Sequence, residues 1–470
     1  MNPITIPNIT IPVIGLPTIG IPSVGFPSAS GGGLVWPKGL KESIKAIYDP
    51  KKQGMTNYDV IEAYVEDFTK FIKNGNGTFT QNKYNSSITT QEWLLYKTNG
   101  KEIEAMDIYI TADDNVSPAL RYYYYTSENN DRKIFNLKVG LNHLPASCYK
   151  EKGSTIGIVF EAQPASEFNI TITQLPTSIL KDLSGNGNHA YLYGGKGKLN
   201  SGIGLYTYDY NSDRWSSTGR ADYIITKKGF EFTNIIEDGG IIFALGSNIA
   251  KEGDKVKVKI SGIPNGGRVY FGTWITATED GEYFGTYAYD NNGNTTIGTL
   301  GCIGATITLE FIPDYPDQLC YDGKMYAVCY GFPILEDYTV MADRTWFDKE
   351  EYSAFVSNSL GGMEDPSNGA FSVEVKSLDS FTVMSFGSLT SISTPEKGIT
   401  YQTKQSYNGI SINVGTRESN DVLTLGGRYY YKNDNNAGNL WNGCHGKIII
   451  ADRSFTEDEI TWLKDNWEKI

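Results

Sequence analysis

Aromatic residues that stand beside amide and carboxylate side chains are the first candidates for chemistry in this chain of 470 residues. A sugar ring is held when an aromatic face and neighbouring hydrogen-bonding side chains contact it together. One such group lies in the middle of the chain, and another surrounds a polar run near the C-terminus. The same residue types also form the cores and edges of β-sheets, so both interpretations stay open. The candidate sugar-binding residues are Trp274, Tyr283, Tyr430, Asn433, Asp434 and Trp441.

An oxygen-rich turn is the candidate for a metal site. Ca²⁺ is bound by carboxylate, amide and backbone oxygens, and Asp182, Asn186 and Asn188 carry such oxygens within seven residues. The same residue types form ordinary hydrogen-bonded turns, and Gly185 and Gly187 tolerate the positive φ that a tight turn needs. A structural turn is therefore the preferred interpretation, with calcium as the weaker alternative and no other cofactor expected.

Acidic residues are plentiful, but they form no recognisable catalytic pattern. A glycosidase needs two carboxylates across a cleft, one of them with a raised pKa, whereas pairs such as Glu279 with Asp280 resemble solvated loops. The chain contains no GxSxG, P-loop or HExxH signature. Its three histidines and five scattered cysteines provide no zinc spacing and no disulfide framework. We therefore predict that the chain is not an enzyme.

The elements that would position these residues follow an unusual N-terminal segment. The first 27 residues contain a five-residue unit repeated five times. Proline returns at every fifth position from Pro7 to Pro27, with one large apolar residue three positions before it and another directly before it. This spacing excludes an α-helix and prevents continuous pairing inside a sheet. Because the repeat is odd, successive apolar pairs point to opposite faces of an extended chain.

No charged side chain precedes Lys38, whereas disordered segments are usually polar and charged. We predict that residues 1–33 form an extended arm and linker, buried against copies of itself or against a partner; a loose tail is the alternative. The arm lacks the basic start and proline-free apolar core of a signal peptide, and its prolines are unsuited to a membrane span. The residues expected to anchor or oligomerise the protein are Ile4, Ile6, Pro7, Ile9, Ile11, Pro12, Ile14, Leu16, Pro17, Ile19, Ile21, Pro22, Val24 and Phe26.

The composition of the remaining chain favours β-sheet domains. Its 51 glycines, 32 tyrosines and many polar turns between short Val, Ile, Tyr and Phe runs are typical of β-sandwiches. The net charge of −13, without a basic stripe, argues against nucleic-acid binding. The predicted fold is mostly β, with the extended arm followed by several β-rich domains.

Residues 34–175 are predicted to form a helix plus β-sandwich domain. A short helix is expected over 40–47, and apolar residues at helical spacing predict a longer amphipathic helix over 57–73. From residue 76 onward, short strand-like runs alternate with polar turns.

The residues from Asp182 to His189 read DLSGNGNH and resemble the turn before the first strand of laminin-G/concanavalin-A-like sandwiches. The end of the chain resembles the last strand and terminal helix of the same family, with Thr456 and Glu459 placed as a capping box. The resemblance implies such a sandwich over 176–470. Because that segment is longer than the sandwich needs, we expect a small inserted β-sandwich over 205–312.

The proline-punctuated arm, the run from Asp49 to Tyr58 and the laminin-G-like C-terminus together resemble virion fibre proteins of crAss-like and related gut bacteriophages. The resemblance implies a structural protein of the phage surface, fixed to the head or the tail with the head favoured, and assembled in the bacterial cytoplasm. It implies a homotrimer, with a dimer as the alternative, attached to capsid or other virion proteins through residues 1–30. Its sandwiches would bind host-surface glycans, without nucleic-acid contact or membrane insertion.

Two other functions stay open from the sequence. A tail fibre or receptor-binding depolymerase would share the arm and the sandwiches but would cleave the glycan that it binds. A bacterial surface lectin or adhesin of the laminin-G class would share the C-terminal domain. The arm favours the virion fibre, because a free enzyme has no need of a long apolar segment. The lectin would need a secretion signal, and none is recognised in the sequence.

Overall fold

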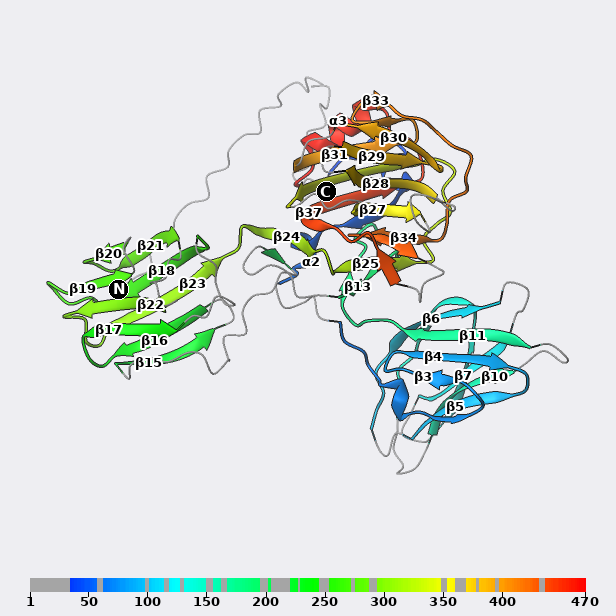
Figure 1. Ribbon diagram of the computed structural model, residues 1–470, viewed down its shortest axis with the longest axis horizontal. Helices are drawn as coiled ribbons and strands as arrows, with labels where there is room; N and C mark the ends of the chain where they lie inside the picture. The colour runs from blue at the N-terminus through cyan, green and yellow to red at the C-terminus, as the bar shows by residue number, and fades with distance from the viewer. Residues whose placement is uncertain are drawn as a thin grey trace, which may run out of the picture.

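The computed structural model consists mainly of β-strands, which confirms the mostly-β fold class predicted from the sequence. Figure 1 shows three β-rich lobes: an insert in green, a first sandwich in blue to teal, and a C-terminal sandwich reaching from yellow to red. In the described part of the chain, the helical elements are α1 (Leu40–Ser43), α2 (Pro50–Gln53), the 3₁₀ turn η1 (Phe68–Lys70) and α3 (Glu457–Asp465). The structure describes residues 34–56, 62–97, 101–113, 118–126, 131–148, 155–161, 167–194, 202–203, 220–226, 229–244, 253–271, 275–286, 294–347, 353–359, 369–377, 380–393, 397–430 and 436–470.

The first sandwich consists of two five-stranded antiparallel sheets that enclose a single apolar core. Side chains alternate between core and solvent along its strands, as in β11, where Ile170 and Ile172 are buried in the core. One sheet has the order β2 (Ile72–Asn74), β5 (Glu92–Lys97), β10 (Thr155–Glu161), β7 (Ala119–Tyr125), β8 (Arg132–Leu137). The other has the order β3 (Thr78–Phe79), β4 (Lys83–Ile88), β11 (Phe168–Gln174), β6 (Met106–Ala112), β9 (Gly140–Leu144).

The helix predicted over 57–73 is wrong for the part that the structure describes. Residues 62–67 are not helical, η1 makes a single 3₁₀ turn, and β2 follows at once. Phe68 and Phe71 are both buried, with ring centroids 5.2 Å apart. Spacing of three residues suits a 3₁₀ turn as well as an α-helix. Ile72 then pairs with Leu95, and the chain continues as a strand of the sheet. Tertiary contacts therefore override the helical spacing of the apolar residues.

The C-terminal sandwich contains two eight-stranded sheets around the largest apolar core. The first sheet has the order β14 (Gly202–Ile203), β24 (Tyr315–Asp322), β37 (Asn442–Ala451), β26 (Thr339–Trp346), β31 (Lys397–Thr403), β32 (Ser406–Tyr407), β33 (Ile410–Ser411), and β1 (Ile44–Tyr48) also pairs with β37. The second has the order β12 (Ile179–Leu180), β13 (Ala190–Tyr193), β25 (Tyr326–Tyr330), β34 (Val422–Leu425), β27 (Ala354–Ser359), β28 (Gly369–Ser377), β29 (Ser380–Ser385), β30 (Ser388–Ile392). A separate hairpin joins β35 (Arg428–Tyr430) to β36 (Asn436–Gly438).

Strand β1 is a part of the C-terminal sandwich, although it lies far upstream in the sequence. β26 pairs along one edge of β37, while β24 and β1 share the other edge, with Ile47 opposite Ile449. The sequence predicts a helix over 40–47 and assigns residues 34–175 to the first domain. The prediction is wrong for β1, because the apolar run of β1 completes a buried sheet rather than an independent helix.

The insert forms two sheets of its own between β14 and β24. They enclose a core separate from those of the other sandwiches, in which Phe232, Val258 and Leu309 are buried. The first sheet has the order β15 (Ala221–Thr226), β16 (Gly229–Ile235), β23 (Thr306–Ile312), β18 (Lys255–Ser261), β21 (Gly281–Thr286). The second has the order β17 (Gly239–Ala244), β22 (Asn294–Leu300), β19 (Arg268–Phe271), β20 (Ile275–Ala277).

Helix α3 begins with the capping box expected from the sequence. Thr456 accepts a hydrogen bond from the backbone N–H of Glu459, whose carboxylate accepts one from the backbone N–H of Thr456. The Glu459 carboxylate also pairs with Arg453 at 2.6 Å. The helix buries Ile460 and Leu463 against the first sheet.

We predict that this ion pair makes stability depend on pH under acidic conditions. Arg453 holds the pKa of Glu459 at about 2, below its ordinary value of 4.5. The stabilisation is therefore complete above about pH 4.5 and is lost as the pH falls towards about 2. Thermal unfolding should show that Glu459→Gln lowers the melting temperature at neutral pH and that the difference shrinks in acid. Asp458→Asn, at an exposed position of the same turn, is the control; a difference that is constant with pH would contradict the assignment.

Candidate functional site

Trp441 is not available to a sugar, which corrects its assignment as a candidate binding residue. Its side chain is 0% exposed, and its ring lies 4.7 Å from Phe355 and 5.3 Å from Tyr321 between ring centroids. The residue follows the β35–β36 hairpin and enters β37, so its position in the core comes from the sheet. Sequence alone could not distinguish this core tryptophan from an exposed one.

The structure does not assemble the other predicted sugar-binding residues into a site. Trp274, Asn433 and Asp434 lie outside the described residues, as does the side chain of Tyr430 in β35. Tyr283 lies in β21 of the insert, packs against its core and donates a hydrogen bond to the backbone oxygen of Glu279 at 2.8 Å. The arm residues predicted for anchoring, from Ile4 to Phe26, also lie outside the described residues.

The Asp182 carboxylate, one of the oxygen groups proposed for calcium, accepts hydrogen bonds within the protein. The Asp182 carboxylate accepts from the backbone N–H groups of Ile47, Ser184 and Asn188 at 2.9–3.0 Å and from the Ser184 hydroxyl at 2.9 Å. Among the described residues, no group of three or more His, Cys, Asp or Glu side chains is arranged to hold a metal. The turn therefore has an evident structural role, which is to bind β1.

The amide side chains of the same turn complete this attachment. Asn186 donates to the backbone oxygen of Ile44, and Asn188 donates to that of Lys45, each at 2.8 Å. The backbone N–H of Leu183 donates to the Ile47 oxygen at 2.8 Å. One edge of β1 pairs with β37, and this turn satisfies backbone groups of β1 from another side.

A buried ionic contact joins Asp49, directly after β1, to Lys447 of β37. Asp49 caps α2 by accepting from the Lys52 backbone N–H at 3.0 Å, and it lies 3.5 Å from the ammonium group of Lys447 in β37. Burial lowers the pKa of Lys447, while the Asp49 charge opposes that shift. Lys447 also donates to the backbone oxygen of Trp467. The segment after the arm is therefore held by both charge and backbone pairing.

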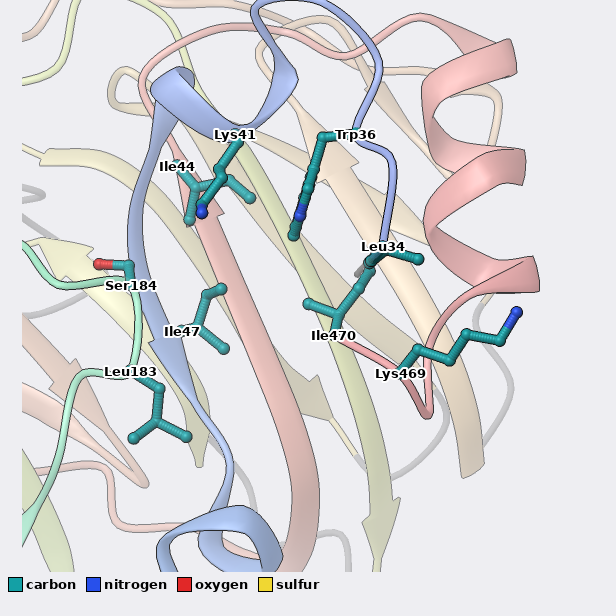
Figure 2. Close-up of a pocket in the computed structure, with 9 residues that line it drawn as sticks. All are labelled: Leu34, Trp36, Lys41, Ile44, Ile47, Leu183, Ser184, Lys469 and Ile470. Atoms are coloured by element: carbon teal, nitrogen blue, oxygen red, sulfur yellow. The ribbon is translucent and has the colours of Figure 1, made fainter. Parts of the chain in front are cut away.

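An apolar groove opens at the place where residues 1–33 join the described chain (Figure 2). Its volume is about 250 Å³. Leu34 and Trp36 form one side, Ile44 and Ile47 of β1 form the floor, and Leu183 lies on the side of the Asp182 turn. The C-terminal Ile470 closes the groove near Leu34, and the lysines Lys41 and Lys469 lie at its margin.

The side chains that line this groove suit an apolar ligand. Six of the nine side chains that line it are large and apolar, so aliphatic groups placed there would lose contact with water. Leu183 remains 40% exposed at its rim, and the neighbouring Val35, which does not line the groove, is 85% exposed. Sequence analysis missed the groove because Leu34 and Trp36 were assigned to the first domain. The signal was the apolar run of Ile44–Tyr48, which is short enough for a strand.

Comparisons with known proteins identify no family. No family model matches the chain, and no curated protein does. Among solved structures, a Trypanosoma rangeli sialidase in complex with sialic acid is 8% identical over 83% of each chain, with a TM-score of 0.24. The N-terminal CBM22 tandem domain of a Paenibacillus barcinonensis protein is 12% identical over 54% of this chain and 89% of that chain, with a TM-score of 0.16. At these scores, neither structure bears on the function of this chain.

None of the helices in the described ranges is long and apolar enough to cross a bilayer.

We predict that the Asp182 turn stabilises the fold without calcium. Chelation of divalent ions should leave the melting temperature of the full chain unchanged, and added calcium should not raise it. Asp182→Ala should lower the free energy of unfolding by about 1–3 kcal/mol, because several backbone donors lose their acceptor. Asp421→Ala, at an exposed position of the same sandwich, should have little effect. A melting temperature that rises with calcium would support a metal site instead.

Proposed function

We propose that this chain is a structural, non-catalytic protein of a bacteriophage particle. Residues 1–30 attach it to the virion and to other copies, with a trimer favoured, and its β-sandwiches adhere to glycans of the host surface. The observation that carries the proposal is the apolar groove at the root of a charge-free, proline-punctuated arm. A carbohydrate-binding protein without an anchor would need neither feature.

The attachment of the arm supports this proposal. The arm continues into α1 and β1, and β1 is paired along β37 in the largest sandwich. A pull on the arm is therefore resisted by hydrogen bonds of a sheet and by the contact between Asp49 and Lys447. In the described chain, both the first sandwich and the insert are connected to this same sandwich. An anchor at this position can carry all three domains.

The groove supports assembly between copies. Each repeat of the arm offers two large apolar side chains and a proline, without charge, and the groove offers an apolar surface beside the start of the arm. In a closed symmetric oligomer every copy makes the same contacts, so an arm repeat that docks in the groove of one neighbour does so around the whole assembly. We assign the groove to an arm repeat of a neighbouring copy.

Deletion of residues 1–30 tests the role of the arm. The truncated protein should keep its melting temperature, because β1 and the groove remain, but its mass should fall from that of an oligomer to that of a monomer. Light scattering measures the mass, and calorimetry reports whether the domains remain folded. Particles produced with the truncated protein should lack it. An unchanged mass together with normal incorporation into particles would contradict the proposal.

A charge in the groove tests its role separately from the arm. Leu183→Glu places a carboxylate at the rim, where docking of an apolar repeat would have to desolvate it. The full-length variant should dissociate at concentrations at which the wild type is oligomeric. Val35→Glu adds the same charge at a nearby exposed residue outside the groove and should not dissociate. Equal masses for both variants and the wild type would remove the groove from the assembly.

A further inference from the structure

A cleft distinct from the apolar groove lies between the first sandwich and the C-terminal sandwich. The two sandwiches share an apolar cluster in which Tyr109 of β6 packs on Tyr330 of β25, with ring centroids 4.5 Å apart. The Tyr191 hydroxyl donates to the Asp107 carboxylate across the same junction at 2.6 Å. These contacts position the walls of the cleft relative to each other.

The wall from the C-terminal sandwich is aromatic. Tyr193 and Tyr326 stack with ring centroids 5.1 Å apart and an angle of 11° between the rings. The hydroxyl groups of Tyr193 and Tyr330 lie 3.0 Å apart within hydrogen-bonding distance. Both of these tyrosines are almost fully buried, whereas Tyr326 remains partly exposed in the cleft. Burial, together with the nearby charge of Glu62, raises the pKa of Tyr326 to about 12, so its hydroxyl stays protonated.

The wall from the first sandwich is polar. Glu62 accepts a hydrogen bond from the backbone N–H of Gly194 at 3.3 Å and another from the hydroxyl of Tyr64. Asn82 donates to the same Tyr64 hydroxyl at 3.0 Å. These bonds hold a carboxylate and an amide in fixed positions at the edge of the cleft. Such pre-positioned groups bind a ligand at a lower entropic cost than mobile side chains do.

Thr173 supplies the observation that points to a ligand. It lies on the face of β11 that points away from the core of the first sandwich, because Ile170 and Ile172 point into that core. The C-terminal sandwich covers that face, so Thr173 is only 7% exposed and lines the cleft. Its hydroxyl makes no hydrogen bond to any group in the described part of the chain. A buried hydroxyl without a partner costs free energy unless a bound molecule supplies one.

We infer that this cleft binds one pyranose ring of a glycan. Its volume of about 330 Å³ lies at the lower end of the range for small-molecule sites. The face of Tyr326 suits the C–H groups of a sugar, while Thr173, Asn82 and Glu62 provide donors and acceptors for its hydroxyl groups. The inference deepens the proposed adhesion function by naming a site, but binding in solution does not depend on attachment to a particle.

Saturation-transfer NMR on the full-length protein tests the inference. The probes are glucose, galactose, mannose, N-acetylglucosamine and N-acetylgalactosamine, each at millimolar concentration, with cyclohexanol as a probe that lacks the array of hydroxyl groups. At least one sugar should receive saturation from the protein, because the cleft is lined by hydrogen-bonding groups. Transfer to cyclohexanol alone would report only apolar contact of the kind that the groove offers. Absence of transfer to all five sugars would overturn the inference.

Variants assign the binding to this cleft. Thr173→Val removes only the hydroxyl and should weaken binding about two- to tenfold; Tyr326→Ala should weaken it by about tenfold or more. The matched control is Thr171→Val on the same face of β11, where the hydroxyl donates to Asn85 outside the cleft. Equal affinity in all variants would place the sugar elsewhere and overturn the inference. Light scattering on the same samples keeps this outcome separate from a failure of assembly.

Discussion

The pairing of β1 with the second half of β37 is the constraint on which the rest of the structure depends. β24 pairs with the first half of the same edge, so β1 completes a sheet whose central residues, Ile448–Ile450, are fully buried. Without β1, buried backbone groups of β37 would lack partners, which is costly. The residues that follow the arm are therefore an obligatory part of the largest domain.

Tyrosine pairs determine how the first sandwich lies on the C-terminal one. The shared cluster contains Tyr191, Tyr193, Tyr330 and Tyr429, and burial is the main cause that raises the pKa of each. Their hydroxyl groups therefore remain protonated, and that of Tyr191 donates to Asp107. Aromatic rings fill the junction, and the Tyr191 hydroxyl forms a hydrogen bond across it. The contacts between the two sandwiches also hold the walls of the cleft in place.

The sequence predicted the features that depend on local pattern and missed those that depend on distant partners. The mostly-β class and the capping box of Thr456 and Glu459 follow from residue types and short spacing, and both are confirmed. In the described part of 57–73, the predicted helix is wrong because Phe68 and Phe71 satisfy a 3₁₀ turn equally well. Trp441 was misread because only the fold reveals that it is enclosed. The partner of β1 lies some four hundred residues away, beyond any local signal.

The apolar groove and the polar cleft lie on opposite faces of one sandwich. Alternation along β37 sends Ile448 and Ile450 into the shared core and Ile449 to the face that carries the groove. In the same way, β25 sends Ala327 into that core and Tyr326 and Tyr330 to the face that carries the cleft. A molecule bound at the groove therefore does not obstruct the cleft. Period-two alternation in two sheets thus separates a surface suited to assembly from one suited to recognition.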